Sequence, residues 1–379
     1  MSKMLRPILT LAILVLALGT LNAQDRYGSK LDPLIERGMK DQKIPGLAVG
    51  VVQNGRLVYS RGFGVMKLGE PAPITPDTLF HMASVTKPFI ATAVMQLTEL
   101  GKIDLDAPVT KYLSYFRLED QRYKTITVRQ MLTHTSGIPD TEDYHWDKPE
   151  YDDGALERYV RSLVQTRLQS EPGTKFTYSD VAYEVLGDVV SKVSGVSVED
   201  YVDQHILKPL GMSSSTLLIN KADPLKLATG YTKGKDVSLG GVELRFHGAV
   251  RAIKFYPYNR AHTPSSNLHS SVVDMARWAI ANMNRGELDG HRILDSSTYD
   301  LMWQRRGPRA GKASIGISWF LGELDGEKSV FHDGGDDGFR TMLVMVPERK
   351  FAFISMANCD YMGDTLTAKL VEAAFQLSK

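Results

Sequence analysis

The sequence predicts an α+β fold in which one antiparallel sheet, built from both ends of the chain, is flanked by helices and carries a mainly helical insertion. Two β-prone runs, 46–52 and 56–65, lie near the N-terminus, and further β-prone runs lie between 315 and 356. Between these two regions, most of the patterned segments have apolar residues at helical spacing. A sheet must bury a face against another layer, so strands at both ends with helices between them favour this layered arrangement.

The N-terminal segment has the features of a signal peptide. Lys3 and Arg6 precede an apolar run from residue 8 to 18, and the small residue Ala23 follows. This run is shorter than the roughly 20 residues that a membrane-spanning helix needs. We therefore expect cleavage of residues 1–23 and a periplasmic or secreted domain of residues 24–379 with no membrane span. An uncleaved anchor is the alternative.

Composition narrows the classes of partner. The single cysteine, Cys359, excludes a disulfide within the chain, which suits a bacterial periplasm without proving one. The net charge is +1, and loss of the signal peptide removes two positive charges, so the mature chain is near −1. No basic stripe is present. Nucleic acid and anionic membrane surfaces are therefore not expected as partners, and nothing in the sequence predicts an oligomeric state.

The N-terminal elements follow from local signals. Residues 28–42 have helical periodicity, and Asn54-Gly55 between two β-prone runs is the strongest short signal for a hairpin. A Pro-rich loop over 70–76 leads to a helix that begins near Ser84 and ends at Gly101. We assign residues 24–83 and 290–379 to the sheet part of the domain and residues 84–289 to the helical part.

The remaining elements follow from the same periodicities. The loop over 140–153 contains Tyr144, His145 and Trp146, which either line a cleft or cover the surface. Residues 213–262 are weakly patterned and are predicted to be largely irregular. Helices are predicted over 154–168, 182–193, 198–207, 272–283 and 363–377, and strands of an antiparallel meander over 315–321, 330–332, 340–346 and 351–356.

Ser84 and Lys87 lie three residues apart at the start of a predicted helix, and hence on one helical face. A serine hydroxyl needs a base to become a nucleophile, and a lysine can be that base if burial lowers its pKa. The backbone N–H of Ser84 is one of the unpaired donors of a helix N-terminus, where the dipole favours negative charge. The alternative is that Ser84 only caps the helix.

Two further groups stand at the ends of predicted elements. Tyr178 precedes a helix and has Asp180 two residues on; the alternative is a packed tyrosine with Asp180 as the N-cap of that helix. His332-Asp-Gly334 lies on a strand before an acidic, glycine-rich loop over 334–338, and its alternative is a β-turn with a histidine on the strand.

Together, Ser84-x-x-Lys87, Tyr178-x-Asp180 and His332-Asp-Gly334 resemble the motifs of the serine β-lactamase and penicillin-binding protein superfamily. They look most like its class C β-lactamase-related branch of serine hydrolases. The family's motifs are Ser-x-x-Lys, Tyr-x-Asn and Lys-Thr-Gly, the last often His-x-Gly in this branch. The resemblance covers roughly residues 28–378 and implies a β-lactamase/transpeptidase-like fold. Flanking stretches also match: Leu132-Thr-His-Thr-Ser-Gly137, Glu171-Pro-Gly173, Lys208-Pro-Leu-Gly-Met212 and His332-Asp-Gly-Gly335.

The resemblance implies a role for each motif. Ser84 would attack a carbonyl and form an acyl-enzyme, with Lys87 and Tyr178 moving its proton to the leaving group. The backbone N–H groups of Ser84 and Gly335 would form the oxyanion hole. Substrate binding would fall to Asp180, His332 and Gly334, with His332 in the place of the family's lysine, contacting a substrate carboxylate or the Tyr178 hydroxyl.

This chain departs from the family at two positions. Asp180 replaces the usual Asn, and an ionised carboxylate cannot donate a hydrogen bond to a substrate carbonyl as an amide can. His332 replaces a permanent cation with a group whose charge we expect to depend on pH near neutrality. Both changes argue against an efficient β-lactamase and are compatible with an esterase or a peptidase acting on D-amino-acid substrates.

The sequence therefore predicts an exported serine hydrolase that acts through an acyl-serine intermediate on an ester or amide substrate, either a small molecule or a peptide. The alternative is a non-catalytic relative that binds cell-wall peptides or a protein partner. Neither a Gly-x-Ser-x-Gly nor a His-Glu-x-x-His motif is present, and there is no cysteine cluster or dinucleotide-binding loop. We expect no cofactor and no metal, and we expect His81 and His134 to be structural.

Overall fold

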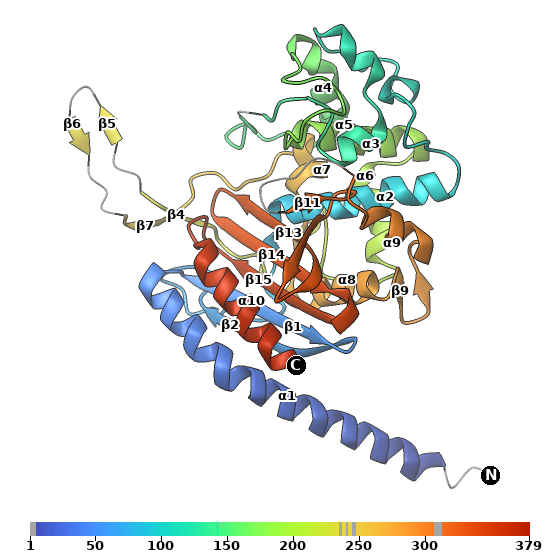
Figure 1. Cartoon of the computed structure of the whole chain (residues 1–379). Coiled ribbons are helices and arrows are strands. Elements are labelled where there is room, and N and C mark those ends of the chain that lie inside the picture. The colour runs from blue at the N-terminus through green and yellow to red at the C-terminus, as the bar shows by residue number, and fades with distance from the viewer. Residues whose placement is uncertain (1–4, 142, 235–236, 240–241, 245–247, 307–312) are drawn as a thin grey trace.

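The computed structural model describes residues 5–141, 143–234, 237–239, 242–244, 248–306 and 313–379. Its centre is a seven-stranded antiparallel sheet of order β11-β12-β13-β14-β15-β1-β2, drawn in blue and red in Figure 1. The two chain ends meet in this sheet, where β1 pairs with β15. The prediction of one sheet built from both ends is therefore confirmed. The strands are β1 (Gly46–Gln53), β2 (Arg56–Gly64), β11 (Ser314–Ile315), β12 (Phe320–Leu324), β13 (Glu327–Asp336), β14 (Phe339–Val346) and β15 (Phe351–Ala357).

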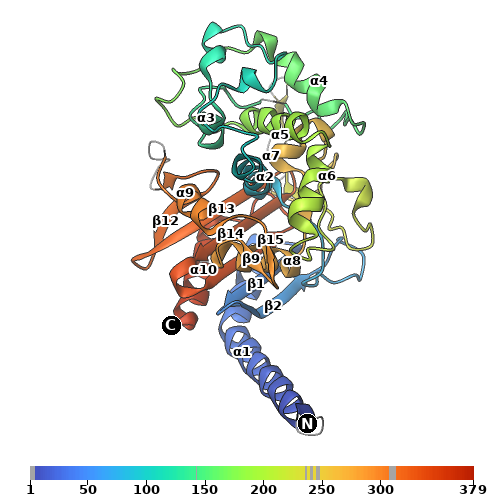
Figure 2. The ribbon, with the colours of Figure 1, turned by 90° about the vertical axis from the view of Figure 1, so that its right-hand side faces the viewer.

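The central strands are buried on both faces, because their side chains alternate between two hydrophobic clusters. In β15, Phe351 and Phe353 belong to one cluster, whereas Ala352 and Ile354 belong to the other. Helices α1 (Leu5–Gln42) and α10 (Asp364–Ser378) cover the first face, and α8 (Val272–Met283) packs on the second. In Figure 2, α1 extends below the sheet and the helical part lies above it.

The predicted hairpin is confirmed at its turn. Asn54 and Gly55 both have positive φ, 53° and 74°, which is the backbone conformation of the two-residue turns that join antiparallel strands. Gly55 adopts it without a steric penalty, and Asn tolerates it better than most residues. The local sequence therefore fixes the register of β1 against β2, which continues to the pair Gly46–Gly64 with one irregularity at Val51/Val52.

The helical part lies above the sheet, on the side that α8 covers (Figure 1). Helix α5 (Asp180–Ser194) is capped by Gly195, which has φ +81° and takes the left-handed conformation. The structure corrects one alternative at the other end of α5, because the N-cap is Ser179 and Asp180 is the first helical residue. The helices of this part are α2 (Lys87–Glu99), α3 (Val128–Leu132), α4 (Ala155–Ser162), α5 (Asp180–Ser194), α6 (Val198–Val202) and α7 (Thr263–Ser266), and α9 (Ser296–Met302) lies beyond α8.

Several predicted ranges differ from the structure. The stretch 213–262 holds short strands as well as irregular backbone, and part of it lies outside the described residues. β13 continues to Asp336, so His332, Asp333 and Gly334 lie within a strand and not at its end. The short strands are β3 (Phe80–His81), β4 (Tyr231–Lys233), β5 (Val237–Leu239), β6 (Val242–Leu244), β7 (Val250–Ala252), β8 (His269–Ser270), β9 (Glu287–Leu288) and β10 (His291–Arg292).

Helix α1 begins within the predicted signal peptide and continues into the helix predicted over 28–42. From residue 24 onward it is docked on the sheet: the Gln24 side chain donates to the Ser60 carbonyl and accepts from the Ser60 amide, and Tyr27 is buried. No helix within the described part of the chain combines the length and the apolar character needed to cross a membrane.

Candidate active site

Ser84 lies in a 3₁₀ turn, Ala83–Thr86, that leads directly into α2. Ala83 has φ +48°, a strained conformation for a residue with a Cβ, and such strain is held only where the surroundings fix it. β13 and β14 provide that support. Thr341 donates a hydrogen bond to the Met82 carbonyl at 2.8 Å, and a Cβ on Gly334 would lie 2.3 Å from the same carbonyl oxygen. Gly334 is therefore a buried packing residue that allows the sheet to approach the serine turn.

The Lys87 side chain is fully buried one helical turn from Ser84. Its Nζ donates to Ser84 Oγ at 2.8 Å and to the Ser265 carbonyl at 3.0 Å, and forms an ion pair with Asp180 Oδ1 at 2.7 Å. Two hydrogen bonds and one ion pair thus hold the ammonium between the serine turn, α5 and α7. The structure therefore joins the first two sequence motifs through Lys87.

The expectation that burial lowers the pKa of Lys87 is wrong. Burial does favour the neutral amine, but the charge of Asp180, with a further contribution from Tyr178, outweighs it and raises the pKa of Lys87 above its ordinary value. Lys87 is thus an ammonium in the resting site. Sequence reasoning considered burial alone and did not place the carboxylate beside the amine.

Tyr178 lies next to this pair, with the Lys87 Nζ 5.0 Å from the centre of its ring. Burial raises the pKa of the Tyr178 phenol, whereas the Lys87 charge and hydrogen bonds to Lys87 and Ser84 act in the opposite direction. At neutral pH the phenol is therefore protonated and can act as a proton donor.

His134 supports the ring of Tyr178 from behind. The two rings stack with centres 4.3 Å apart, and the His134 Nδ1 accepts a hydrogen bond from the Ser179 amide at 3.2 Å. Burial, with the Lys87 charge, holds the pKa of His134 well below its ordinary range, so it is neutral. Its structural role agrees with the prediction, but that role lies in the site itself. The one sequence signal for a place in the site was that Leu132–Gly137, which contains His134, matches a stretch typical of the family.

His332 faces the same site from β13 and is buried. Burial, partly offset by Asp333, lowers the pKa of His332 to about 4, and its Nδ1 donates to the Asp333 carbonyl at 2.7 Å. This corrects the expectation of a charge that changes near neutrality, because a neutral His332 supplies no cation above about pH 5. Its Nε2 is then an acceptor, and it has no hydrogen-bond partner among the residues that the structure describes.

The edge of β13 beside these groups is open. β12 pairs with β13 only as far as Phe331, whereas β14 pairs along it to Asp336. Among the described strands, the other edge from His332 to Asp336 therefore has no partner. Gly335 lies on this stretch and, unlike Gly334, is exposed. The backbone at Gly335 is accordingly available to a bound group, as an oxyanion hole requires.

A cleft of about 930 Å³ adjoins Gly335. Tyr144 and Trp146 form one wall with rings stacked 4.8 Å apart, so these two residues of the 140–153 loop line a cleft, whereas the His145 side chain is exposed. The cleft also carries charge of both signs. Its other lining residues are Asp143, Thr232, Lys233, Gly234, Gly248, Asp336, Asp337, Arg340, Asp360 and Tyr361.

Asp180 does not face this cleft freely. While Oδ1 pairs with Lys87, Oδ2 accepts a hydrogen bond from the Tyr144 hydroxyl at 2.7 Å, and the Asp180 amide donates to Asp140 Oδ1 at 2.8 Å. Burial, with the Asp180 charge, raises the pKa of Asp140 to about 6. The sequence did not indicate Asp140, or the contact of Tyr144 with Asp180, because these contacts join segments about 40 residues apart.

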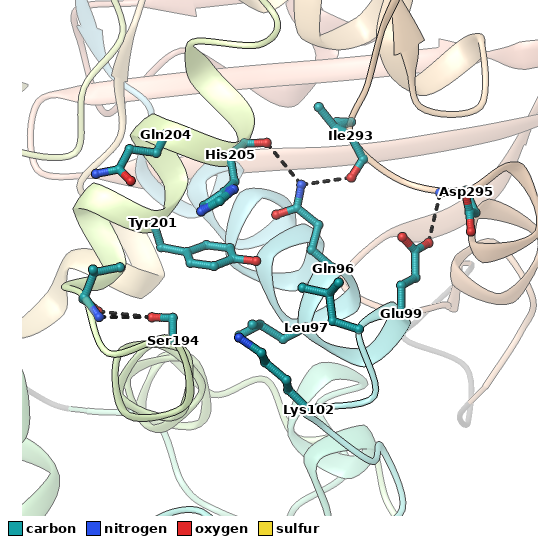
Figure 3. Close-up of a pocket in the computed structure, with 12 residues that line it drawn as sticks. Gln96, Leu97, Glu99, Lys102, Ser194, Tyr201, Gln204, His205, Ile293 and Asp295 are labelled. Carbon is teal, nitrogen blue, oxygen red and sulfur yellow. Dashed lines mark hydrogen bonds between the residues drawn. The ribbon is translucent and has the colours of Figure 1, made fainter.

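A second cavity of about 510 Å³ lies at the other end of α2 (Figure 3). α2 rises about 1.5 Å per residue, so its far end is roughly 18 Å from Lys87. Gln96 donates to the carbonyls of His205 and Ile293 across this cavity, and none of the predicted site residues lines it. Its labelled residues are Gln96, Leu97, Glu99, Lys102, Ser194, Tyr201, Gln204, His205, Ile293 and Asp295. The candidate active site is therefore the group of residues around Ser84, beside the cleft that Gly335 lines.

Comparison with known proteins agrees with this geometry. The Beta-lactamase family model matches residues 31–376. The chain belongs to the Beta-lactamase family. As a member of that family it has the β-lactamase/transpeptidase-like fold that the motifs implied. The octameric penicillin-binding protein homologue from Pyrococcus abyssi is 27% identical, with a TM-score of 0.76 over 93% of this chain and 77% of that one.

Other relatives are similarly distant. A class C β-lactamase has a TM-score of 0.75 over 93% of this chain and 96% of that chain, and at 21% identity it shows the shared fold alone. Protein flp of Staphylococcus aureus strain MW2 is 28% identical over 90% of this chain and 65% of its own length. An unguisins hydrolase of Aspergillus campestris is 28% identical over 86% of this chain and 61% of its own. The chain thus spans somewhat less than two thirds of these curated relatives.

Proposed function

We propose that this Beta-lactamase family member is an exported serine hydrolase that forms an acyl-enzyme on Ser84. The observation that carries the proposal is the 2.8 Å hydrogen bond between Ser84 Oγ and the buried Lys87 Nζ, with Tyr178 beside both and the open backbone of Gly335 nearby. A nucleophile, proton-transfer groups and backbone donors are the parts that acyl transfer requires. The printed name of the fungal relative, a hydrolase, supports the same class of reaction.

The reaction proceeds in two halves. Ser84 Oγ attacks the substrate carbonyl and loses its proton to the site, and the negative charge that forms on the carbonyl oxygen is bound by the backbone N–H groups of Ser84 and Gly335. When the tetrahedral intermediate collapses, the bond to the leaving group breaks, Tyr178 protonates that group, and the proton that Ser84 gave to the site passes to Tyr178. Water then attacks the acyl-serine by the same route, releasing the acid and restoring the Ser84 hydroxyl.

We propose an ester or a peptide of D-amino acids as the substrate class, with β-lactams poor by comparison. The charge states of Asp180 in the second motif and His332 in the third support this preference. Asp180 is engaged by Lys87 and Tyr144 and cannot donate to an acylamide carbonyl. His332 is neutral at neutral pH, so it offers no permanent charge to the carboxylate of a penicillin.

Ester hydrolysis is expected to exceed β-lactam turnover. An ester's leaving group departs more readily than an amine, so it depends less on well-aimed proton delivery. The measurement is kcat/KM for a panel of short-chain p-nitrophenyl esters, D-amino-acid peptides and the chromogenic cephalosporin nitrocefin. Nitrocefin hydrolysis far faster than that of every ester tested would show the ranking to be wrong.

The proposed export of the protein depends on its N-terminal segment. The mature chain is expected to begin near Gln24, because Lys3, Arg6, the apolar run that follows them and Ala23 form a signal peptide. Expression of the full sequence in a bacterial host, followed by N-terminal sequencing of the exported form, checks this. An exported form that still begins at Met1 would indicate an anchor in place of a cleaved signal.

A further inference from the structure

Asp180 differs chemically from the asparagine that the resembled family has at this position. An amide oxygen can accept a hydrogen bond from an ammonium but does not take its proton, whereas a carboxylate is a base. In this chain the carboxylate oxygen Oδ1 lies 2.7 Å from Lys87 Nζ in a site where Lys87 is fully buried and Asp180 is 5% exposed. The substitution therefore places a proton acceptor inside the nucleophile's own hydrogen-bond network.

The resting charge of Lys87 makes such an acceptor necessary. An ammonium cannot take the Ser84 proton until it has lost one of its own. Among the described groups around Nζ, Ser84 Oγ is the group to be deprotonated and the Ser265 carbonyl is a very weak base. The neighbouring Tyr178 phenol is already protonated. Asp180 is the remaining base in contact with Nζ.

We propose that Asp180 is a catalytic residue of the reaction proposed above, on which this inference rests, and that it receives a proton from Lys87 as Lys87 receives the proton of Ser84. In this step the Ser84 O–H bond breaks and a bond forms between Oγ and the substrate carbonyl carbon. One proton moves from Oγ to Nζ and another from Nζ to Oδ1. Lys87 remains an ammonium, Asp180 becomes a neutral acid, and the negative charge passes to the carbonyl oxygen. On collapse, a proton passes to the leaving group and Asp180 is ionised again.

The surroundings orient Asp180 for this transfer. Tyr144 donates to Oδ2, whereas Oδ1 has no hydrogen-bond partner among the described residues and lies 2.7 Å from Lys87 Nζ. Tyr144 is thus a positioning residue, and it belongs to the loop that also lines the substrate cleft. The titratable groups that interact with Asp180 come from every element around it: Lys87, Asp140, Tyr144, Tyr159, Tyr178, Tyr183, Glu184 and His332.

Asp180→Asn tests the proposal, because it keeps the shape and removes the base. In the wild type, Lys87 stays an ammonium and the Asp180 carboxylate is in place to accept its proton. In the variant, the charge that raises the Lys87 pKa is gone, and Lys87 can act only where it is itself neutral. We expect kcat/KM for p-nitrophenyl acetate to fall at least about 100-fold at pH 6, the lower end of the range for a proton-transfer group. The loss should shrink by about tenfold per pH unit as pH rises.

A pH–rate profile of Asp180→Asn with the wild-type shape and rates would overturn the proposal, since the amide would then serve as well as the carboxylate. Asp188→Asn is the matched control, because it removes another buried carboxylate of α5 that accepts from Tyr115 and not from the Lys87 network, and it should keep the wild-type profile. Thermal unfolding of each variant reports whether the fold is retained.

Chemical rescue provides a second measurement. Formate should restore activity to Asp180→Ala in a concentration-dependent way, and formamide should not, because only formate can accept a proton. Equal rescue by both, or by neither, would contradict the proposal. Fluorophosphonate labelling of the wild type at Ser84 tests the proposed function separately from the role of Asp180. If the wild type is not labelled, the proposed function fails. If it is labelled while Asp180→Asn behaves as the wild type, only the proposed role of Asp180 fails.

Discussion

Ser84→Ala is expected to abolish covalent labelling by a fluorophosphonate and all ester hydrolysis, while the protein stays folded. The expected loss is the largest of any single substitution, since the variant has no atom that can form the acyl bond. The fold should tolerate it, because the Ser84 side chain is only partly buried and its hydroxyl serves Lys87 and not the core. The measurement is in-gel fluorescence after labelling, together with kcat for a p-nitrophenyl ester.

The control for this substitution is Ser213→Ala, which removes an exposed serine hydroxyl from the loop after α6. It should label and turn over as the wild type does. Labelling that persists in Ser84→Ala at another serine, located by peptide mass mapping, would overturn the assignment of the nucleophile. A wild type that resists labelling altogether would favour the non-catalytic alternative.

Tyr178→Phe is expected to lower kcat by about 10²–10⁴-fold, the usual range for a positioned proton-transfer group. The substitution keeps the ring that stacks on His134 and removes only the hydroxyl group beside Lys87 and Ser84. Activity of the wild type should decline as the pH is lowered from neutral to acid, because the site must accept the Ser84 proton. His332 should contribute no step near neutrality, because its pKa is about 4. The measurement is kcat of both proteins across that pH range.

Tyr183→Phe is a matched control, since it removes a second buried phenol close to Lys87, but one that donates to the Leu132 carbonyl. It should cost stability and leave kcat within a few-fold of the wild type. If Tyr178→Phe also stays within a few-fold at every pH, the phenol takes no part in proton transfer and Tyr178 is a packing residue at the entry to α5.

The parts of the fold that sequence predicted well are those set by local chemistry. The Asn54-Gly55 turn needs only its two positive φ values, and α8 keeps the predicted bounds 272–283 because its apolar spacing and flanking polar residues agree. The end of β13 was misjudged because glycines at 334 and 335 usually interrupt strands. Here Gly334 is required by the close approach of the serine turn, which the sequence alone does not show.

For the site, the sequence predicted which residues come together but not their charges. The motif spacing brought Ser84, Lys87 and Tyr178 into one hypothesis, and the structure places them in contact or side by side. The electrostatics were not predictable in the same way. The pKa of Lys87 depends on Asp180, and that of His332 on its burial, and both are consequences of tertiary packing. The same holds for Tyr144, whose bond to Asp180 joins a loop to a helix.

The central claim is that Ser84 carries an acyl group during turnover, and mass spectrometry of the trapped intermediate tests it most directly. The protein is mixed with p-nitrophenyl acetate, quenched in acid within the first turnovers, digested and mapped. The account predicts a gain of one acetyl group on the peptide that contains Ser84, and no such gain in Ser84→Ala. An active wild type with no acylated peptide, or with the acetyl group on a different residue during turnover, would contradict it.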